Sequence, residues 1–313
     1  FHQHGPYLLN GAYGWGYMQD CIRWAWILRG TKFEFPKEKT DVLTHLVLEG
    51  NHWMIRRGYR DPTIDGRAIT RSHMATRQTS LGALSTLIQL LELNVERQDE
   101  IKALKAHIEG QRDDSLVGDK HFWRSDYHCH RTPASLISLR MTSRRTMGPE
   151  AINGENTLGY YQCAGLTNLL HEGSEYQRIY PVMDWMLLPG TTTPVKDSPP
   201  RFGRAVSGTT DFVGGVTDGA TGLCAMDLNW DDVTGKKCWF FTDDGMVAMG
   251  AGMAHEHGTS LQTAINQCIG QATLRLARGQ DVTSHQEIQQ LGLDADWIAH
   301  EAFAYIPLGD ATV

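Results

Sequence analysis

Apolar residues recur at spacings of three and four in four stretches of the first 110 residues, which predicts four helices. The recurring positions are Met18, Cys21, Ile22, Ala25 and Trp26; Leu43, Leu46, Val47 and Met54; Leu81, Leu84, Ile88 and Leu91; and Ile101, Leu104 and Ile108. Pro36 suits the first turn of the second helix, and Gly110 is a suitable stop for the last. The pattern therefore predicts an antiparallel helical array over residues 1–110.

Beyond a polar and charged stretch at residues 111–120, the apolar period changes to two. Strands are predicted over residues 134–141, 221–228, 237–241, 246–249 and 297–308. Turn signals at Asp218-Gly219 and Asp244-Gly245 separate some of these strands. Many strands without long helices between them are typical of stacked antiparallel sheets. We therefore predict an α+β, multidomain chain, with a helical domain at 1–110 and an antiparallel β-sheet domain at 111–313.

Length, composition and charge exclude several classes of protein. A chain of 313 residues allows two domains at about 150 residues each. Apolar residues make up 41% and charged residues 21%, which excludes a disordered chain. No apolar run approaches the roughly 18 residues of a membrane span, and a net charge of −7 argues against a general nucleic-acid binder. The chain opens at Phe1 without a signal peptide and stops just after a strand-like run, so we expect a piece of a longer protein.

Residues 51–77 form a local basic segment in this acidic chain, with six arginines against two aspartates. The arginines are Arg56, Arg57, Arg60, Arg67, Arg71 and Arg77, and the aspartates are Asp61 and Asp65. Guanidinium groups bind carboxylates and sulfates through paired hydrogen bonds, whereas a solvated helix end would have the same composition. Arg67 and Arg71 are four residues apart, so on a helix they would point to one side.

Histidines and cysteines give only weak metal signals. The pairs His2/His4, His128/His130 and His255/His257 are bare HxH motifs, and none has a third ligand at a recognised spacing. The six cysteines are scattered without a CxxC pair, so most are expected to be small buried apolar residues. We therefore predict no metal ligand among the site residues.

Several segments, taken in order, resemble polysaccharide lyase family 8, which includes the chondroitin AC, hyaluronate and xanthan lyases. They are His4 with Tyr13, residues 65–71 (DGRAITR), 143–146 (SRRT), 150–156 (EAINGEN), 180–192 and 236–241 (KKCWFF). The resemblance covers most of the chain. It implies the C-terminal part of an incomplete α/α toroid, followed by a sandwich-like antiparallel β-sheet domain. It also implies a secreted or periplasmic bacterial protein.

The resemblance also implies roles for individual residues. His4 and Tyr13 would be the catalytic pair, and Arg67 and Arg71 would support the site and bind substrate. Glu150, which would hold an arginine in place, and the substrate-binding Asn153 would reach in from the sheet domain. The asparagine that the family uses in catalysis, and its aromatic patch, would fall before Phe1.

The implied activity is that of a carbon–oxygen lyase acting on polysaccharides (EC 4.2.2.-). It would cleave a uronic-acid-containing polysaccharide, a glycosaminoglycan such as chondroitin sulfate or hyaluronan, by β-elimination, which leaves a 4,5-unsaturated uronate. No cofactor is required for this electron flow, and the sequence is compatible with a structural cation. We expect a monomer whose partner is the acidic polysaccharide, with no nucleic acid and no membrane span.

Three alternatives remain. The chain could be a catalytically inactive carbohydrate-binding relative, or a lyase for xanthan or another uronate polymer. It could also be a glycoside hydrolase on a helical toroid. Hydrolysis uses two carboxylates about 5–9.5 Å apart, for which Asp61, Asp65 and Glu150 are available. Absorbance of the product distinguishes these activities, because only a lyase creates an unsaturated uronate.

Overall fold

The computed structural model describes residue 2 and residues 4–74, 82–111, 113–270, 273–285 and 295–308. Two residues of the sequence predictions, Arg77 and Leu81, lie outside these ranges. The chain divides into two compact units, Phe1–Gln267 and Cys268–Val313. Both contain antiparallel sheets, and the first also contains the helices, which confirms the α+β class.

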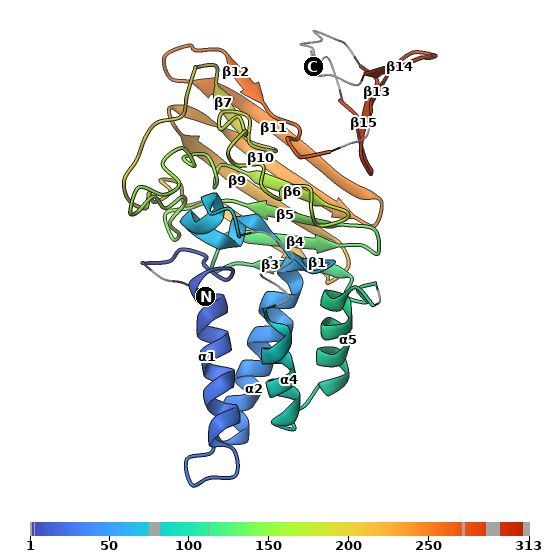
Figure 1. Ribbon diagram of the computed structural model, residues 1–313. Coiled ribbons are helices and arrows are strands. Elements are labelled where there is room, and N and C mark those ends of the chain that lie inside the picture. Colours follow the sequence, from blue (N-terminus) through green and yellow to red (C-terminus); the bar gives the residue numbers. More distant parts are fainter. Residues whose placement is uncertain are drawn as a thin grey trace. The chain divides into compact units, whose positions relative to one another are not determined.

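Four helices lie side by side in the first unit: α1 (Tyr13–Leu28), α2 (Lys37–His45), α4 (Leu84–Glu92) and α5 (Gln98–Glu109) (Figure 1). They enclose an apolar core in which Ile22, Leu90 and Ile101 are completely buried. Between α2 and α4 the chain forms π-helical η1 (Leu46–Asn51), 3₁₀-helical η2 (His52–Met54), strands β1 (Ile55–Arg56) and β2 (Tyr59–Arg60), and 3₁₀-helical η3 (Pro62–Thr70). None of the described helices has the length and apolar character needed to cross a membrane.

The apolar spacing predicted α5 better than it predicted α2 and α4. Ile101, Leu104 and Ile108 are all buried, and Gly110 ends α5 in the left-handed conformation with φ 78°. The predicted second helix ends early at His45, where the chain continues into η1, and Pro36 precedes its first turn. In α4 the predicted stripe was right for Leu84 and Leu91, which are partly buried against the core, and wrong for Ile88, which is exposed.

The leucines of α4 explain this error. Leu87 and Leu90 are buried in place of Ile88. Ile88 lies at one edge of the apolar stripe of α4 and Leu90 at the other, so spacing alone did not show which edge is covered. Packing against α1 and α5 decided which face is covered.

Two four-stranded antiparallel sheets follow in the first unit. One contains β3 (Gly118–Phe122), β4 (Tyr127–Arg131), β5 (Leu136–Arg140) and β6 (Leu166–Leu170), paired in that order. The other contains β8 (Val213–Thr217), β9 (Gly222–Trp230), β10 (Val233–Thr242) and β11 (Gly245–His255), also paired in sequence order. A two-stranded pair joins β7 (Thr192–Pro194) to β12 (Leu261–Thr263). The first four predicted strands overlap β5, β9, β10 and β11.

The two four-stranded sheets pack against each other (Figure 1). The ring of His128 on β4 stacks on Phe241 of β10, with ring centroids 4.4 Å apart. Gly118 lies so close to Gly219 that a Cβ atom at 118 would be 2.5 Å from the carbonyl oxygen of Gly219. Its φ of 126° is also one that side chains other than glycine rarely adopt.

The second unit is a small antiparallel sheet of β13 (Leu274–Arg278), β14 (Asp281–His285), β15 (Trp297–His300) and β16 (Phe303–Tyr305). The prediction of one strand over 297–308 was wrong, because the chain turns back at Glu301, with φ 52°, and forms a hairpin.

The predicted division into domains near residue 110 stays a prediction. The last helix of the described residues ends at Glu109, and β3 begins at Gly118. The two compact units, however, divide between Gln267 and Cys268, so helices and most strands share one unit.

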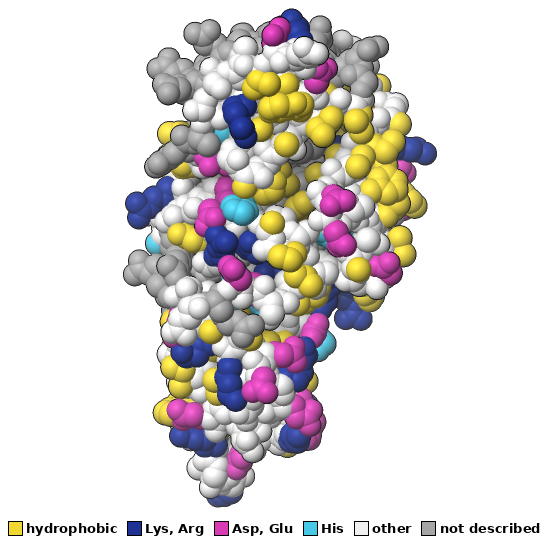
Figure 2. All heavy atoms as spheres, turned by 90° about the vertical axis from the view of Figure 1, so that its right-hand side faces the viewer, with side chains coloured by type: hydrophobic (Ala, Val, Ile, Leu, Met, Phe, Trp, Pro, Cys, Tyr) yellow, Lys and Arg dark blue, Asp and Glu magenta, His cyan; other side chains and the backbone are white. Residues whose placement is uncertain are grey.

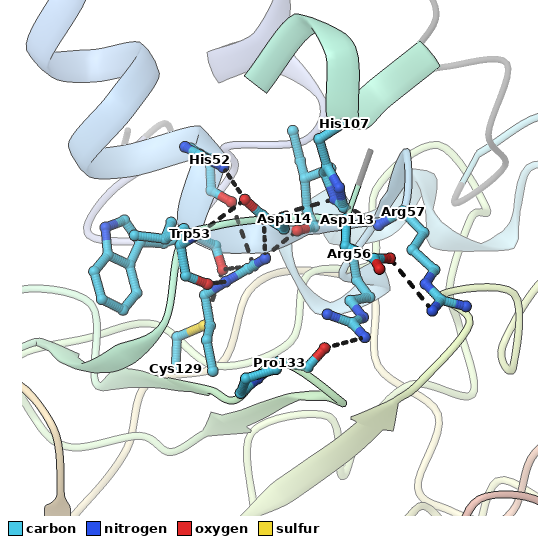
Figure 3. A network of polar contacts seen from close by, with 12 residues as sticks. His52, Trp53, Arg56, Arg57, His107, Asp113, Asp114, Cys129 and Pro133 are labelled. Atoms are coloured by element: carbon cyan, nitrogen blue, oxygen red, sulfur yellow. Dashed lines mark hydrogen bonds and ion pairs between the residues drawn. The ribbon is translucent and has the colours of Figure 1, made fainter. Parts of the chain in front are cut away.

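A buried ionic network ties the segment η2–β1 to the first sheet (Figure 3). Arg131 of β4 donates to the carbonyl oxygens of Ile55 and Trp53, at 2.7 Å and 3.1 Å, and forms an ion pair with Asp114. His52 Nε2 lies 3.0 Å from the Asp114 carboxylate. Burial alone would raise the pKa of Asp114, but the His52 hydrogen bond and the Arg131 charge hold it well below its usual range.

Candidate active site

Arg67 is the centre of a polar cluster built from three segments of the first unit. Its Nη2 donates to the Tyr13 hydroxyl oxygen at 3.0 Å, and its Nη1 donates to Glu150 Oε1 at 3.1 Å. The same Glu150 oxygen is hydrogen-bonded to His4 Nδ1. The structure therefore brings together His4, Tyr13, Arg67 and Glu150, which come from the N-terminal loop, the start of α1, η3 and the segment after β5.

The cluster has a buried ionic base and a partly exposed aromatic rim. Arg67 and Glu150 are buried, whereas Tyr13 is 45% exposed and the His4 side chain 35%. The two rings lie edge to face, with centroids 5.9 Å apart and planes at 75°. The phenol and the imidazole are therefore accessible from solvent, whereas Arg67 and Glu150 are not.

Arg71 joins the cluster through a different carboxylate, that of Glu155. Its Nε and Nη2 donate to the two Glu155 oxygens at 2.6 Å and 2.9 Å, and Arg67 Nε donates to Glu155 at 3.2 Å. The hydrogen bond from Arg71, supported by both arginine charges, lowers the pKa of Glu155 against the opposing effect of burial. Glu155 thus bridges the two arginines.

Glu155 lies within the motif 150–156, but the motif predicted no role for it. A signal was present, because two arginines four residues apart need carboxylate partners, and Glu150 and Glu155 are the two acidic residues of segment 150–156. Asn153 lies between these glutamates on an exposed turn, with φ 61°. Within the described residues its side chain makes no hydrogen bond, and its role in substrate binding stays a prediction.

Electrostatics keep Arg67 charged. Burial is the largest single influence on its pKa and would lower it. The hydrogen bond with Tyr13 and the charge of Glu150 together outweigh burial, so the pKa of Arg67 is raised. A permanent positive charge therefore lies within hydrogen-bonding distance of the Tyr13 oxygen.

A close contact at Gly5 and a backbone hydrogen bond of Pro6 position the loop that carries His4 and leads to Tyr13. Gly5 has φ 111°, and a Cβ atom there would be 2.3 Å from the sulfur of Met147. Met147 N donates to the carbonyl oxygen of Pro6 at 3.0 Å, three residues before Glu150. The loop is therefore fixed to the segment that supplies the carboxylate of the site.

A buried aspartate and a glycine position Arg67 within η3. Asp61 accepts hydrogen bonds from Thr63 N, from the Tyr127 hydroxyl at 2.7 Å and from Asn168 Nδ2 at 2.9 Å, which anchor the start of η3 to the first sheet. Gly66 interrupts η3 with φ 60° and ψ −140°, a conformation that favours glycine. Because Gly66 immediately precedes Arg67, this kink sets the direction of the backbone at Arg67.

The arginine-rich segment does not form the single basic patch that its sequence indicates. Arg56 is buried and donates to the carbonyl oxygens of His171 and Pro133, at 2.8 Å and 3.0 Å. Arg60 is buried against Asp65, 3.1 Å away. On the face shown in Figure 2, the helical part carries acidic and basic side chains intermixed. Proximity in sequence could not show that the β1–β2 hairpin buries two of these arginines.

Two family models together match almost the whole chain. The model described as "Polysaccharide lyase family 8, N terminal alpha-helical domain" matches residues 1–110. The model described as "Polysaccharide lyase family 8, super-sandwich domain" matches residues 117–313. The chain therefore belongs to polysaccharide lyase family 8, which confirms the resemblance seen in its motifs.

Curated and solved relatives agree with this assignment. A chondroitinase-AC of Pedobacter heparinus is 29% identical over 97% of this chain and 43% of its own length. A hyaluronate lyase of Thermasporomyces composti is 25% identical over 85% of this chain and 39% of its own length. The structure of a chondroitinase AC lyase, solved as enzyme–oligosaccharide complexes, superposes with a TM-score of 0.91 at 27% identity, covering 98% of this chain and 46% of that one. The chain thus spans less than half the length of these relatives.

Proposed function

We propose that the protein is a polysaccharide lyase that cleaves a uronic-acid-containing glycosaminoglycan, such as chondroitin sulfate or hyaluronan, by β-elimination. The observation that carries the proposal is the hydrogen-bonded set of His4, Tyr13, Arg67 and Glu150 in a member of this family. The names of the chondroitinase-AC and hyaluronate lyase relatives support the substrate class.

The reaction removes the hydrogen on C5 of the uronate and expels the group on C4, which forms a C4=C5 double bond. The C5 hydrogen is only weakly acidic, because the adjacent carboxylate is already negative. Elimination therefore needs neutralisation of that carboxylate, a base near C5 and an acid at the glycosidic oxygen. Stabilising the developing charge is commonly the largest contribution in such reactions.

Tyr13 is proposed as the base and then the acid. Its hydroxyl is partly exposed and accepts a hydrogen bond from Arg67, so a positive charge lies beside the oxygen that becomes negative when the proton leaves. The phenolate would take the C5 proton and then return it to the leaving oxygen. Because one group performs both steps, no second carboxylate is needed, in contrast to glycoside hydrolysis.

His4 would bind the carboxylate of the reacting uronate, and the arginines would bind negative charges of the polymer. Glu150 accepts from His4 Nδ1, which leaves Nε2 as the ring nitrogen available to substrate. Arg71 is 42% exposed and can contact anionic groups beyond the reacting sugar. Asn153 is proposed to bind the substrate from its exposed turn.

The proposal extends to the architecture and setting of the protein. We propose that α1, α2, α4 and α5 are the C-terminal part of an incomplete α/α toroid and that the sheets are sandwich-like, which the descriptions of the two family models support. We propose that catalysis needs no cofactor. The protein would act outside the cytoplasm, where such polymers occur, and as a monomer, because one chain supplies all the residues of the cluster.

An ultraviolet assay of the full-length protein on a panel of polymers tests the function. We expect absorbance to rise with chondroitin sulfate or hyaluronan, because each cleavage creates an unsaturated uronate, and to stay flat with a neutral glucan. Binding without absorbance would identify an inactive carbohydrate-binding relative. New reducing ends without absorbance would identify a hydrolase. A rise in absorbance with xanthan alone would identify a xanthan lyase.

Two glutamate variants test the different positions of Glu150 and Glu155. Glu150→Gln weakens two charge-assisted hydrogen bonds, a buried one with Arg67 and a partly buried one with His4, and such bonds are worth roughly 1.5–3 kcal/mol each. We therefore expect kcat/KM to fall about 10²-fold, since 1.4 kcal/mol is about tenfold. Glu155→Gln weakens a half-exposed pair worth about 1 kcal/mol or less and should cost under about tenfold. Steady-state kinetics of both variants give the comparison, and equal losses would contradict the proposed division of roles.

A further inference from the structure

A second polar cluster lies between the two four-stranded sheets, and the proposed lyase chemistry does not use it. His121 of β3 and His128 of β4 are direct cross-strand partners. Cys224 comes from β9 of the other sheet, and its Sγ lies 3.7 Å from His121 Nδ1. One potential ligand atom from each of these three residues lies within 4.8 Å of the other two.

Two ring nitrogens of this cluster have no hydrogen-bond partner in the part of the chain that the structure describes. His128 Nε2 is hydrogen-bonded to Asp119 Oδ2 at 2.8 Å, but its Nδ1 is buried without a hydrogen-bond partner among the described residues. His121 Nε2 is in the same situation. Buried polar atoms in native proteins are nearly always satisfied, and leaving one unsatisfied costs about 1–3 kcal/mol. The unpaired nitrogens are therefore open to a ligand.

His130, on the same strand as His128, has a hydrogen-bond partner for each of its ring nitrogens. Its Nδ1 is bonded to Asp119 at 3.0 Å and its Nε2 to the carbonyl oxygen of Thr242 at 3.0 Å. Both nitrogens of His130 are hydrogen-bonded, so only His128 of the pair 128/130 remains as a candidate metal ligand. The candidate Cys224 was not recognisable from a spacing, because β9 follows much later in the chain, and His121 comes from the neighbouring strand β3.

The backbone of β8 lies close to the cluster, and the glycine at position 215 leaves room for the side chains of the cluster. A Cβ atom at Gly215 would lie 2.7 Å from His121 Nδ1 and 2.8 Å from Cys224 Sγ, both too close for a real contact. His121 is only half-buried, which gives an ion a path from solvent.

We propose that His121, His128 and Cys224 form a structural site for a thiophilic divalent ion, Zn²⁺, which links the two sheets. Two imidazoles and a thiolate are preferred zinc ligands, and a water molecule would complete the tetrahedron. Asp119, bonded to His128 Nε2, would hold the ring in the tautomer that presents Nδ1, as carboxylates commonly do for zinc-bound histidines.

Binding of the ion to Cys224 uses the thiolate form of this side chain. On binding, the S–H bond breaks, a Zn–S bond forms, and the proton passes to solvent.

Metal titration of the chelator-treated, full-length protein tests the site. We expect one equivalent of Zn²⁺ to bind and to raise Tm, and one equivalent of Co²⁺ to produce a thiolate-to-metal charge-transfer band. Cys224→Ala should abolish the band and the rise in Tm. Cys163→Ala, which removes a second buried free thiol, should leave both unchanged. Circular dichroism of each variant checks that it is folded.

Other outcomes would overturn the proposal. The wild-type protein could bind no equivalent, or bind Co²⁺ without the thiolate band, and this measurement needs no variant to fold. Binding lost in His257→Ala but kept in Cys224→Ala would assign the ion to the exposed His255/His257 pair. Because the readouts are metal content, absorption and Tm, a negative lyase assay would leave this test intact.

Discussion

Tyr13→Phe is expected to abolish nearly all turnover while leaving binding of the intact polymer unchanged. The substitution deletes one hydroxyl and keeps the ring, so the edge-to-face contact with His4 survives. General acid–base assistance is worth about 10²–10⁴-fold. Because the proposed mechanism uses the same hydroxyl for both proton transfers, the loss should reach the upper end of that range or exceed it. Ultraviolet turnover and equilibrium binding of the polymer would be measured together.

Tyr17→Phe is the matched control, because Tyr17 lies one turn further along α1 and is also exposed. We expect this variant to keep its turnover. Near-wild-type turnover in Tyr13→Phe would remove the mechanism proposed here and would make His4 the leading candidate for the base.

Asp114→Asn is expected to produce the largest loss of stability. The change removes the negative partner of Arg131 and leaves the arginine charge buried, with only carbonyl oxygens and a neutral amide around it. Breaking a buried ion pair from one side typically costs about 3–5 kcal/mol. Chemical denaturation followed by fluorescence or circular dichroism gives the free energy of unfolding of both proteins.

The cost of Asp114→Asn should also depend on pH. The pKa of Asp114 is lowered by folding, so the unfolded state binds a proton more readily than the folded state. The stabilisation by Asp114 is therefore complete above the unfolded pKa of about 4 and is lost as pH falls towards the folded value. The difference between wild type and variant should shrink from pH 6 to pH 3.

Asp99→Asn supplies the control for stability. Asp99 forms an exposed ion pair with Lys102 on α5, and such pairs contribute about 0–1 kcal/mol. A loss in Asp114→Asn as small as that in Asp99→Asn would mean that the buried network does not hold η2 and β1 to the sheet.

The period of apolar residues predicted elements well where one face of an element is buried. In α5, the apolar residues Ile101, Leu104 and Ile108 lie on one face, and charged residues lie on the others. Only one face could therefore enter the core. In β9 the pattern of period two was equally clear, with Cys224, Met226 and Leu228 buried. The prediction failed for Ile88 in α4, which lies at one edge of the apolar stripe, because packing against neighbouring helices decided which edge is covered.

The candidate site was predicted in part for a different reason. Ordered motifs identified His4, Tyr13, Arg67 and Glu150, but periodicity carries no information about which ions pair across the fold. Whether Glu155 bridges Arg67 and Arg71 depends on the course of a segment that lies far from them in sequence.

The sequence by itself determined the α+β class, the family and the residues of the candidate catalytic cluster, because these depend on local periodicity and on ordered motifs. Only the tertiary structure decided which arginines are buried, which carboxylate holds which arginine, and that Cys224 meets His121 and His128. These features depend on contacts between segments far apart in the chain. Such contacts arise when helices and sheets exclude water from their shared faces, and no short stretch of sequence records them.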